Sequence, residues 1–280
     1  MEDILVSTEW LVSNINNDDI FVIEVNAKLS ESNEHIPSAL VWDLHQTFEN
    51  SITLDVINDI QFKNLMEKNG INNDSTIILY GDGDNRSATY AFWVFKYYRH
   101  NSVKILDGSI KKWKNDGNII DFENDISGRQ KIQTKSNYEV KNPDLTIRIT
   151  KDQILKNIEN FSIIDVRTFD EFLGKSDGIS TAIEGDSIRR RGRIPGAKHL
   201  EWTQLLNDDG TFKSIDKISE IVRQKNIVDS EEIITYCRLG VRASYVWFAL
   251  KYLLGFSEVK NYDGSWTEWG NSVGVPIEID

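Results

Sequence analysis

The chain has 280 residues, of which 40% are hydrophobic and 27% are charged, a composition typical of a soluble globular protein with room for two domains. Its net charge of −12 argues against nucleic acid and anionic membranes as partners, and no run approaches the ~18 apolar residues of a membrane span. The single cysteine excludes an intramolecular disulfide, and the first residues lack the basic stretch of a signal peptide, so we expect a cytoplasmic protein.

The first half of the chain alternates short β-branched runs with longer amphipathic runs. In chain order we expect a helix starting after Ser7, a strand over residues 20–25, a helix over 61–69, a strand over 76–80, a helix over 87–99 and a strand over 103–106. Strands that alternate with helices form parallel sheets, because a helical crossover returns the chain to the same edge. The pattern predicts an α/β domain over residues 1–125.

A polar stretch without periodicity, residues 126–145, predicts a linker. After it we expect a helix over residues 150–158, a strand over 161–166, a helix over 214–225, a strand over 232–236, a helix over 243–254 and a strand over 257–262. The same alternation therefore predicts a second α/β domain over residues 146–280.

The two halves of the chain repeat each other. Gly81 stands where Cys237 stands 156 residues later (81 to 237), and Asp107-Gly108-Ser109 precedes Asp263-Gly264-Ser265 by the same spacing. A period this long indicates a duplicated domain and not a solenoid. The first copy lacks the cysteine, so we expect it to be a structural or partner-binding lobe.

The loop of the first copy is acidic. Asp82, Asp84 and Asn85 follow Gly81, and the two aspartates would repel an anion. A calcium loop is the alternative interpretation, but the loop lacks the bidentate glutamate that closes such sites.

The cysteine lies between the strand over residues 232–236 and the helix that follows, in the stretch Cys237-Arg238-Leu239-Gly240-Val241-Arg242. The N–H groups that open a helix have no partner inside it and bind anions. A thiolate is an anion, and Arg238 and Arg242 add positive charge, while Gly240 lets the loop turn its amides inward. Simple packing of a buried thiol is the alternative, but the flanking arginines favour chemistry.

This loop resembles the active-site loop of the rhodanese family, in the Cys-Arg-x-Gly-x-Arg/Thr form of thiosulfate sulfurtransferases. Three further stretches resemble family motifs in the same order: Asp165-Val166-Arg167, residues 192–197 and residues 261–269. The resemblance implies two tandem rhodanese-like domains, each a mainly parallel sheet flanked by helices. It also implies a sulfurtransferase that moves the sulfane sulfur of thiosulfate to cyanide or a thiol through a persulfide on Cys237.

The resemblance assigns roles to residues around the nucleophile. It makes Cys237 the catalytic residue, implies no metal and no cofactor, and makes a small anionic sulfur donor and a cyanide or thiol acceptor the partners. Some relatives carry a donor-binding arginine four residues after Arg167, where this chain has Glu171, so we expect Arg193 to replace it. The expected donor-binding residues are Arg238, Leu239, Gly240, Val241, Arg242 and Arg193, and the expected supporting residues are Asp165, Arg167 and Trp266.

Three other functions fit parts of the pattern. A phosphatase needs Cys-x5-Arg, but the spacing from Cys237 to Arg242 is Cys-x4-Arg. The mercaptopyruvate branch of the family carries Cys-Gly-Ser/Thr-Gly-Val-Thr, from which Arg238 and Arg242 depart. A persulfide carrier or binding module without turnover would keep the same cysteine.

Overall fold

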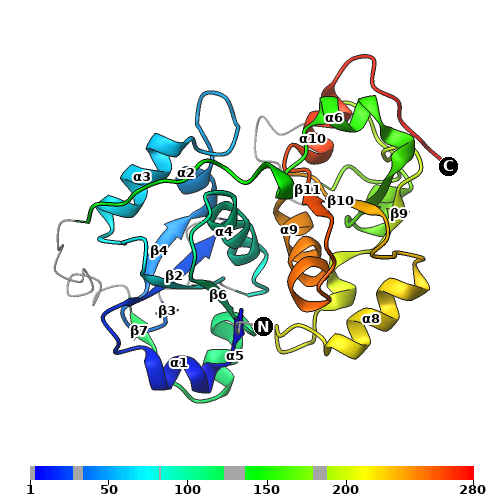
Figure 1. Cartoon of the computed structure of the whole chain (residues 1–280). Helices are drawn as coiled ribbons and strands as arrows, with labels where there is room; N and C mark the ends of the chain where they lie inside the picture. The colour runs from blue at the N-terminus through cyan, green and yellow to red at the C-terminus, as the bar shows by residue number, and fades with distance from the viewer. Residues whose placement is uncertain (1–3, 28–33, 82, 123–135, 179–187) are drawn as a thin grey trace. The chain divides into compact units, whose positions relative to one another are not determined.

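The computed structural model describes residues 4–27, 34–81, 83–122, 136–178 and 188–280. The chain divides into two compact units (Figure 1). The first unit comprises Met1–Asp144 and Asn207–Phe212, and the second comprises Leu145–Leu206 and Lys213–Asp280. Within the described ranges, no helix is both long and apolar enough to cross a membrane.

The first unit is built on a five-stranded parallel sheet in the order β1-β6-β5-β2-β4. Its central strands are buried on both faces, as expected for a parallel sheet covered by helices. A small antiparallel pair, β3 (Glu34–His35) and β7 (Asp121–Phe122), stands apart from it. The strands of the main sheet are β1 (Leu5–Val6), β2 (Ile20–Asn26), β4 (Leu40–Asp43), β5 (Thr76–Tyr80) and β6 (Val103–Leu106).

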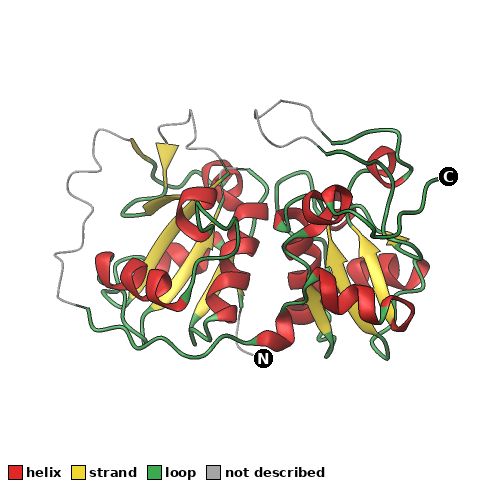
Figure 2. Cartoon of the chain, turned by 90° about the horizontal axis from the view of Figure 1, so that it is seen from above, coloured by secondary structure: helices red, strands yellow, loops and turns green. Residues whose placement is uncertain are grey.

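Helices flank this sheet on either side of the strands (Figure 2). Ser7 caps the first helix with its side chain, as the sequence predicts. The most buried helix, α4 (Arg86–Tyr97), contributes Tyr, Phe and Trp side chains to the core. The others are α1 (Thr8–Asn14), α2 (Leu44–Phe48), α3 (Asp59–Lys68) and α5 (Ser109–Asn115).

Two segments without helix or strand belong to the first unit. In the predicted linker, residues 126–135 lie outside the described residues. Residues 136–144 are anchored by the buried Tyr138, whose ring stacks on the His100 ring with 5.9 Å between the ring centres. The segment Asn207–Phe212 joins this unit from a distant part of the sequence, and the Phe212 N–H donates to the Asp107 carboxylate at 2.9 Å. Long-range packing of this kind leaves no local signal in the sequence.

The second unit has a four-stranded parallel sheet in the order β11-β10-β8-β9. Its strands are β8 (Phe161–Asp165), β9 (Lys198–His199), β10 (Glu232–Tyr236) and β11 (Val259–Asn261). Its α-helices are α6 (Lys151–Lys156), α7 (Phe169–Phe172), α8 (Ile215–Gln224), α9 (Val241–Phe248) and α10 (Ser265–Asn271). The 3₁₀ helices are η2 (Leu145–Ile147), η3 (Ile158–Asn160) and η4 (Trp202–Leu205).

The helix after the cysteine differs from the prediction at both ends. It begins at Val241 and not at residue 243, because the Ser244 N–H already donates to the Gly240 carbonyl at 2.9 Å. Its last turn, Ala249–Leu253, is π-helical, and Gly255 then leaves the helix with φ +76°. The fold class is otherwise as predicted: each unit is a parallel sheet flanked by helices.

The internal repeat extends to individual hydrogen bonds. In the second unit the Tyr236 hydroxyl donates to Asp165 at 2.6 Å and accepts the Ile194 N–H at 3.2 Å. In the first unit the Tyr80 hydroxyl donates to Glu24 and accepts the Ile36 N–H at 3.0 Å. A buried tyrosine therefore ties the central strand to a neighbouring carboxylate in both units.

Candidate active site

Cys237 directly follows the central strand β10, at the carboxyl end of the sheet, where α/β proteins hold their sites. The residue is 1% exposed. Its backbone N–H donates to Ser265 Oγ at 3.0 Å, and its carbonyl accepts the Trp266 N–H at 3.0 Å. Two consecutive residues at the start of α10 therefore hold both backbone polar groups of the cysteine.

The loop after Cys237 turns at Gly240. This residue has φ +80°, and a Cβ added there would lie 2.8 Å from the Asp263 Cα, so only glycine fits. Asp263 is held in turn by Arg148, which makes two hydrogen bonds to its carboxylate at 2.9 and 2.8 Å. The loop therefore packs at Gly240 against the turn between β11 and α10, which the bonds from Arg148 to Asp263 hold in place.

The sequence predicts that the loop offers its backbone amides to an anion. The N–H groups of Leu239, Gly240 and Val241 make no hydrogen bond to any residue in the described ranges. Val241 is also the first residue of α9, where the positive end of the helix dipole lies. Unpaired amides at a helix start can bind an anion or stabilise negative charge on sulfur.

Arg242 places its positive charge beside this loop. Its guanidinium makes two hydrogen bonds to the Glu171 carboxylate, at 2.7 and 2.8 Å. Burial disfavours the charged form of Arg242, but the bonds to Glu171 and the interaction with Cys237 outweigh it and raise its pKa above the usual value. Arg242 therefore stays cationic near Cys237.

Glu171 is the site residue that the sequence analysis noted only as a departure from the family pattern. It is 1% exposed, and burial favours its neutral form, but the hydrogen bonds and charge of Arg242 lower its pKa to about 2. Thr168 caps α7 and donates to Glu171 from its N–H and its hydroxyl, each at 3.0 Å. The spacing Thr168-x-x-Glu171 is a capping box, and this signal could have placed Glu171 at the sheet edge.

Arg238, the second arginine of the loop, is half-buried. Its guanidinium donates to the Gly178 carbonyl at 3.4 Å. Gly178 itself lies against Glu171, because an added Cβ would come within 2.3 Å of Glu171 Oε1. Glu171 therefore pairs with Arg242 directly and lies against the glycine whose carbonyl accepts from Arg238.

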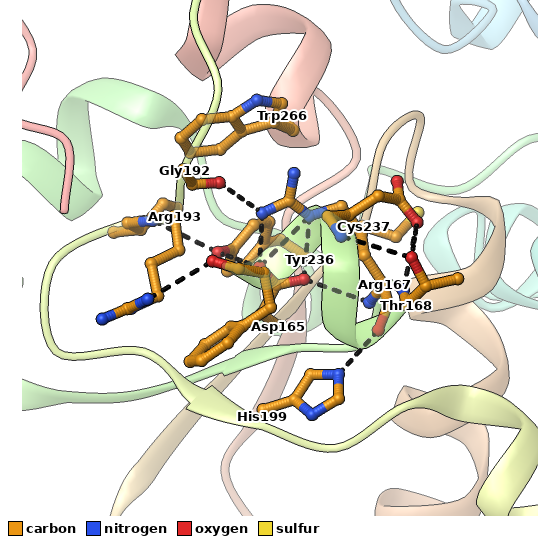
Figure 3. Close-up of polar contacts among 12 residues, drawn as sticks. Asp165, Arg167, Thr168, Gly192, Arg193, His199, Tyr236, Cys237 and Trp266 are labelled. Atoms are coloured by element: carbon orange, nitrogen blue, oxygen red, sulfur yellow. Dashed lines mark hydrogen bonds and ion pairs between the residues drawn. The ribbon is translucent and has the colours of Figure 1, made fainter. Parts of the chain in front are cut away.

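Arg193 is directed elsewhere. Its guanidinium pairs with Glu278 and with Asp280, the latter at 2.6 Å, and it lies 4.4 Å from the centre of the Phe172 ring. Figure 3 shows its side chain extending away from Cys237. The structure does not bring Arg193 to the loop, because carboxylates near the end of the chain hold it.

The three expected supporting residues form one buried cluster. Arg167 pairs with Asp165 at 2.6 Å and lies 4.6 Å from the centre of the Trp266 ring (Figure 3). Arg167 also donates to the Gly192 carbonyl at 2.7 Å, and Trp266 donates from Nε1 to the Arg190 carbonyl at 3.0 Å. The cluster ties strand β8, residues 190–192 and helix α10 together.

In the corresponding loop of the first unit, the groups near Gly81 hydrogen-bond to other protein groups. The Gly81 N–H donates to Asn85 Oδ1 at 2.9 Å, and Asn85 donates to the Leu106 carbonyl at 2.7 Å. Asp84 pairs with Arg86 at 2.8 Å, whereas Asp82 lies outside the described residues. Asn85 and Asp84, two of the residues of the alternative calcium loop, are thus engaged by protein groups. Within the described ranges, no three His, Cys, Asp or Glu side chains lie close enough together to hold a metal ion.

A family model described as "Rhodanese-like domain" matches residues 7–116 and 150–272. The chain belongs to the rhodanese family. Both units are therefore rhodanese-like domains, and the prediction of a tandem member of this sulfurtransferase family is confirmed.

Two curated relatives are similar along almost their whole length. A Saccharopolyspora erythraea protein named "Putative thiosulfate sulfurtransferase" is 39% identical over 279 residues, which cover 99% of this rhodanese and 96% of the relative. The "Sulfur carrier protein TtuD" of Thermus thermophilus is 38% identical over 281 residues, which cover 98% and 96%.

Among solved structures, the anaerobic ergothioneine biosynthesis enzyme of Chlorobium limicola, in complex with trimethyl histidine, has a TM-score of 0.82. It is 24% identical, and the match covers 99% of this rhodanese and 70% of that chain. At this identity the similarity concerns the fold alone.

Proposed function

We propose that this rhodanese is a thiosulfate sulfurtransferase that works through a persulfide on Cys237. The observation that carries the proposal is the position of Cys237: it opens a loop with three amides unpaired within the described ranges, and Arg242 lies beside it. This arrangement suits a nucleophile whose substrate and leaving group are both small sulfur anions. The sulfurtransferase name of the curated relative supports the same donor.

In the first step the Cys237 thiolate attacks the sulfane sulfur of thiosulfate. A bond forms between the two sulfur atoms, the S–S bond of thiosulfate breaks, and sulfite leaves with the electron pair. The amides of Leu239, Gly240 and Val241, together with Arg238 and Arg242, stabilise the donor and the charge on the departing sulfite. The product is a cysteine persulfide.

In the second step an acceptor attacks the outer sulfur of the persulfide. Cyanide becomes thiocyanate, or a thiolate becomes a persulfide, and Cys237 leaves as the thiolate. Both steps are displacements at sulfur, and the scheme as written calls on no metal or cofactor.

The residues around the loop and the two domains take separate roles in this scheme. Asp165, Arg167 and Trp266 support the site, and residues 146–280 form the catalytic domain. Arg193 stays a proposed donor ligand, although its guanidinium is engaged by Glu278, Asp280 and Phe172. Residues 1–125 form a domain without sulfur transfer, because Gly81 stands in place of the cysteine.

A second candidate is a sulfur carrier, which the similarity to TtuD favours. A carrier forms the same persulfide but hands the sulfur to a partner protein and stops after one sulfur with small acceptors. An enzyme consumes thiosulfate repeatedly in the presence of cyanide. Steady-state thiocyanate formation therefore separates the two functions.

The experiment that tests the proposal is intact mass spectrometry of the purified protein before and after thiosulfate, with cyanide added last. We expect a gain of about one sulfur atom that cyanide removes, and no gain in Cys237→Ser. If the protein gains no sulfur from thiosulfate but gains it from mercaptopyruvate, the donor is mercaptopyruvate and not thiosulfate. No gain with either donor would contradict sulfur transfer through Cys237.

A further inference from the structure

Ser265 makes a contact with the nucleophile for which neither the sequence motifs nor the proposed chemistry accounts. It is fully buried and is the first residue of α10. Its hydroxyl accepts the Cys237 N–H at 3.0 Å and donates to the Tyr262 carbonyl at 2.7 Å. Its backbone has φ 50°, a left-handed conformation that residues with a Cβ rarely adopt.

The contact affects the cysteine in two ways. First, the Ser265 hydroxyl and the Trp266 N–H together fix the peptide groups on both sides of the Cys237 Cα. The sulfur is one rotatable bond away from that Cα, so its direction depends on this backbone. Second, the Cys237 N–H is already used, which leaves the amides of Leu239, Gly240 and Val241 to face an anion.

The first unit provides an internal comparison. Ser109 is the repeat equivalent of Ser265 (109 to 265), and it is also fully buried, with φ 58°. Its hydroxyl, however, donates to the Gly83 carbonyl at 3.0 Å, and the Gly81 N–H goes to Asn85 instead. The buried serine with positive φ thus belongs to the fold of both units, whereas the bond to the nucleophile position occurs only in the unit that has the cysteine.

We propose that Ser265 is a positioning residue for sulfur transfer, whose hydroxyl orients Cys237 toward the donor and keeps the Cys237 N–H out of the anion-binding loop. This inference rests on the proposed function of Cys237. Without the hydroxyl, the buried N–H loses its acceptor, and the loop shifts to satisfy it. The donor still meets the other amides and both arginines, so the loss falls on the rate of the chemical step and not on donor binding.

The test compares Ser265→Ala and Ser265→Gly with Ser109→Ala as the matched control. Glycine tolerates the positive φ, so Ser265→Gly removes the hydroxyl without backbone strain. Single-turnover persulfide formation is followed by rapid quench and intact mass over a range of thiosulfate concentrations. We expect both Ser265 variants to lower the maximal rate by about tenfold or more, with the half-saturating concentration within about twofold of wild type. Ser109→Ala keeps the wild-type rate.

Three results would overturn the inference: a wild-type maximal rate in Ser265→Gly, an equal loss in Ser109→Ala, or a loss confined to the half-saturating concentration. The rate of Cys237 alkylation by iodoacetamide at a pH where the thiol is fully ionised adds a readout that needs no sulfur donor. If the wild-type protein takes no sulfur, the proposed function fails. A changed alkylation rate in both Ser265 variants, and not in Ser109→Ala, would still support positioning, and an unchanged rate would refute it.

Discussion

Replacement of Glu171 by glutamine removes the negative partner of Arg242 while keeping the shape of the side chain. The pKa of Glu171 is about 2, against an ordinary value of 4.5, and the residue is 1% exposed, so little solvent screening applies. A difference of this size corresponds to about 3 kcal/mol of folding stability at neutral pH. Breaking a buried ion pair by removing one partner costs a similar amount, about 3–5 kcal/mol.

The assay is urea denaturation of wild type and Glu171→Gln between pH 7 and pH 2. Because the folded-state pKa lies below the unfolded-state value, the contribution of Glu171 is complete above about pH 4.5 and is lost as the pH falls toward 2. We therefore expect the two proteins to differ by about 3 kcal/mol at pH 7 and to converge in acid. Glu220→Gln, which removes an exposed pair with Lys217, is the control and leaves stability unchanged.

Two outcomes would refute this reasoning. Equal stability of wild type and Glu171→Gln at pH 7 would mean that the pair with Arg242 adds nothing to the fold. A full difference that persists at pH 2 would mean that the loss comes from packing of the amide and not from the charge of Glu171.

Three further predictions concern the loop and one buried carboxylate. Arg238→Gly combined with Arg242→Thr should raise turnover of mercaptopyruvate relative to thiosulfate, and an unchanged ratio in steady-state assays contradicts the role of both arginines. Gly240→Ala should lower thiosulfate turnover more than tenfold, since its Cβ would meet the facing backbone at 2.8 Å, whereas Gly117→Ala, which has φ +77° but open space, should keep activity. Burial raises the pKa of Asp107 from 3.8 to about 6, so wild type should lose stability relative to Asp107→Asn as the pH rises from about 4 to 6. Melting temperatures of the two proteins that change with pH in the same way would contradict this prediction.

Local patterns in the sequence were sufficient for most of the fold. Strands β5 and β10 were predicted with their observed bounds, because each is a short apolar run between polar turns. The duplication was also visible from the sequence, and it reappears in the paired tyrosines Tyr80 and Tyr236. The short elements, among them β9 and α7, were missed because two to four residues carry no periodic signal.

For the site, the sequence by itself was enough to predict Cys237 as the nucleophile and to place its loop between a strand and a helix. Cys237 follows a strand and precedes a helix, and Gly240 supplies the positive φ at which the loop turns. These are properties of neighbouring residues, so the chain order is enough to predict them.

The tertiary structure alone decided which charges and hydrogen-bonding groups meet. Arg242 pairs with Glu171, which lies 71 positions away, and Arg193 is held by Glu278, which lies 85 positions away. Ser265 reaches the Cys237 amide across 28 positions. An arginine can donate to any carboxylate within reach, and a buried N–H can donate to any nearby oxygen, so only the distances in the folded chain select the partner.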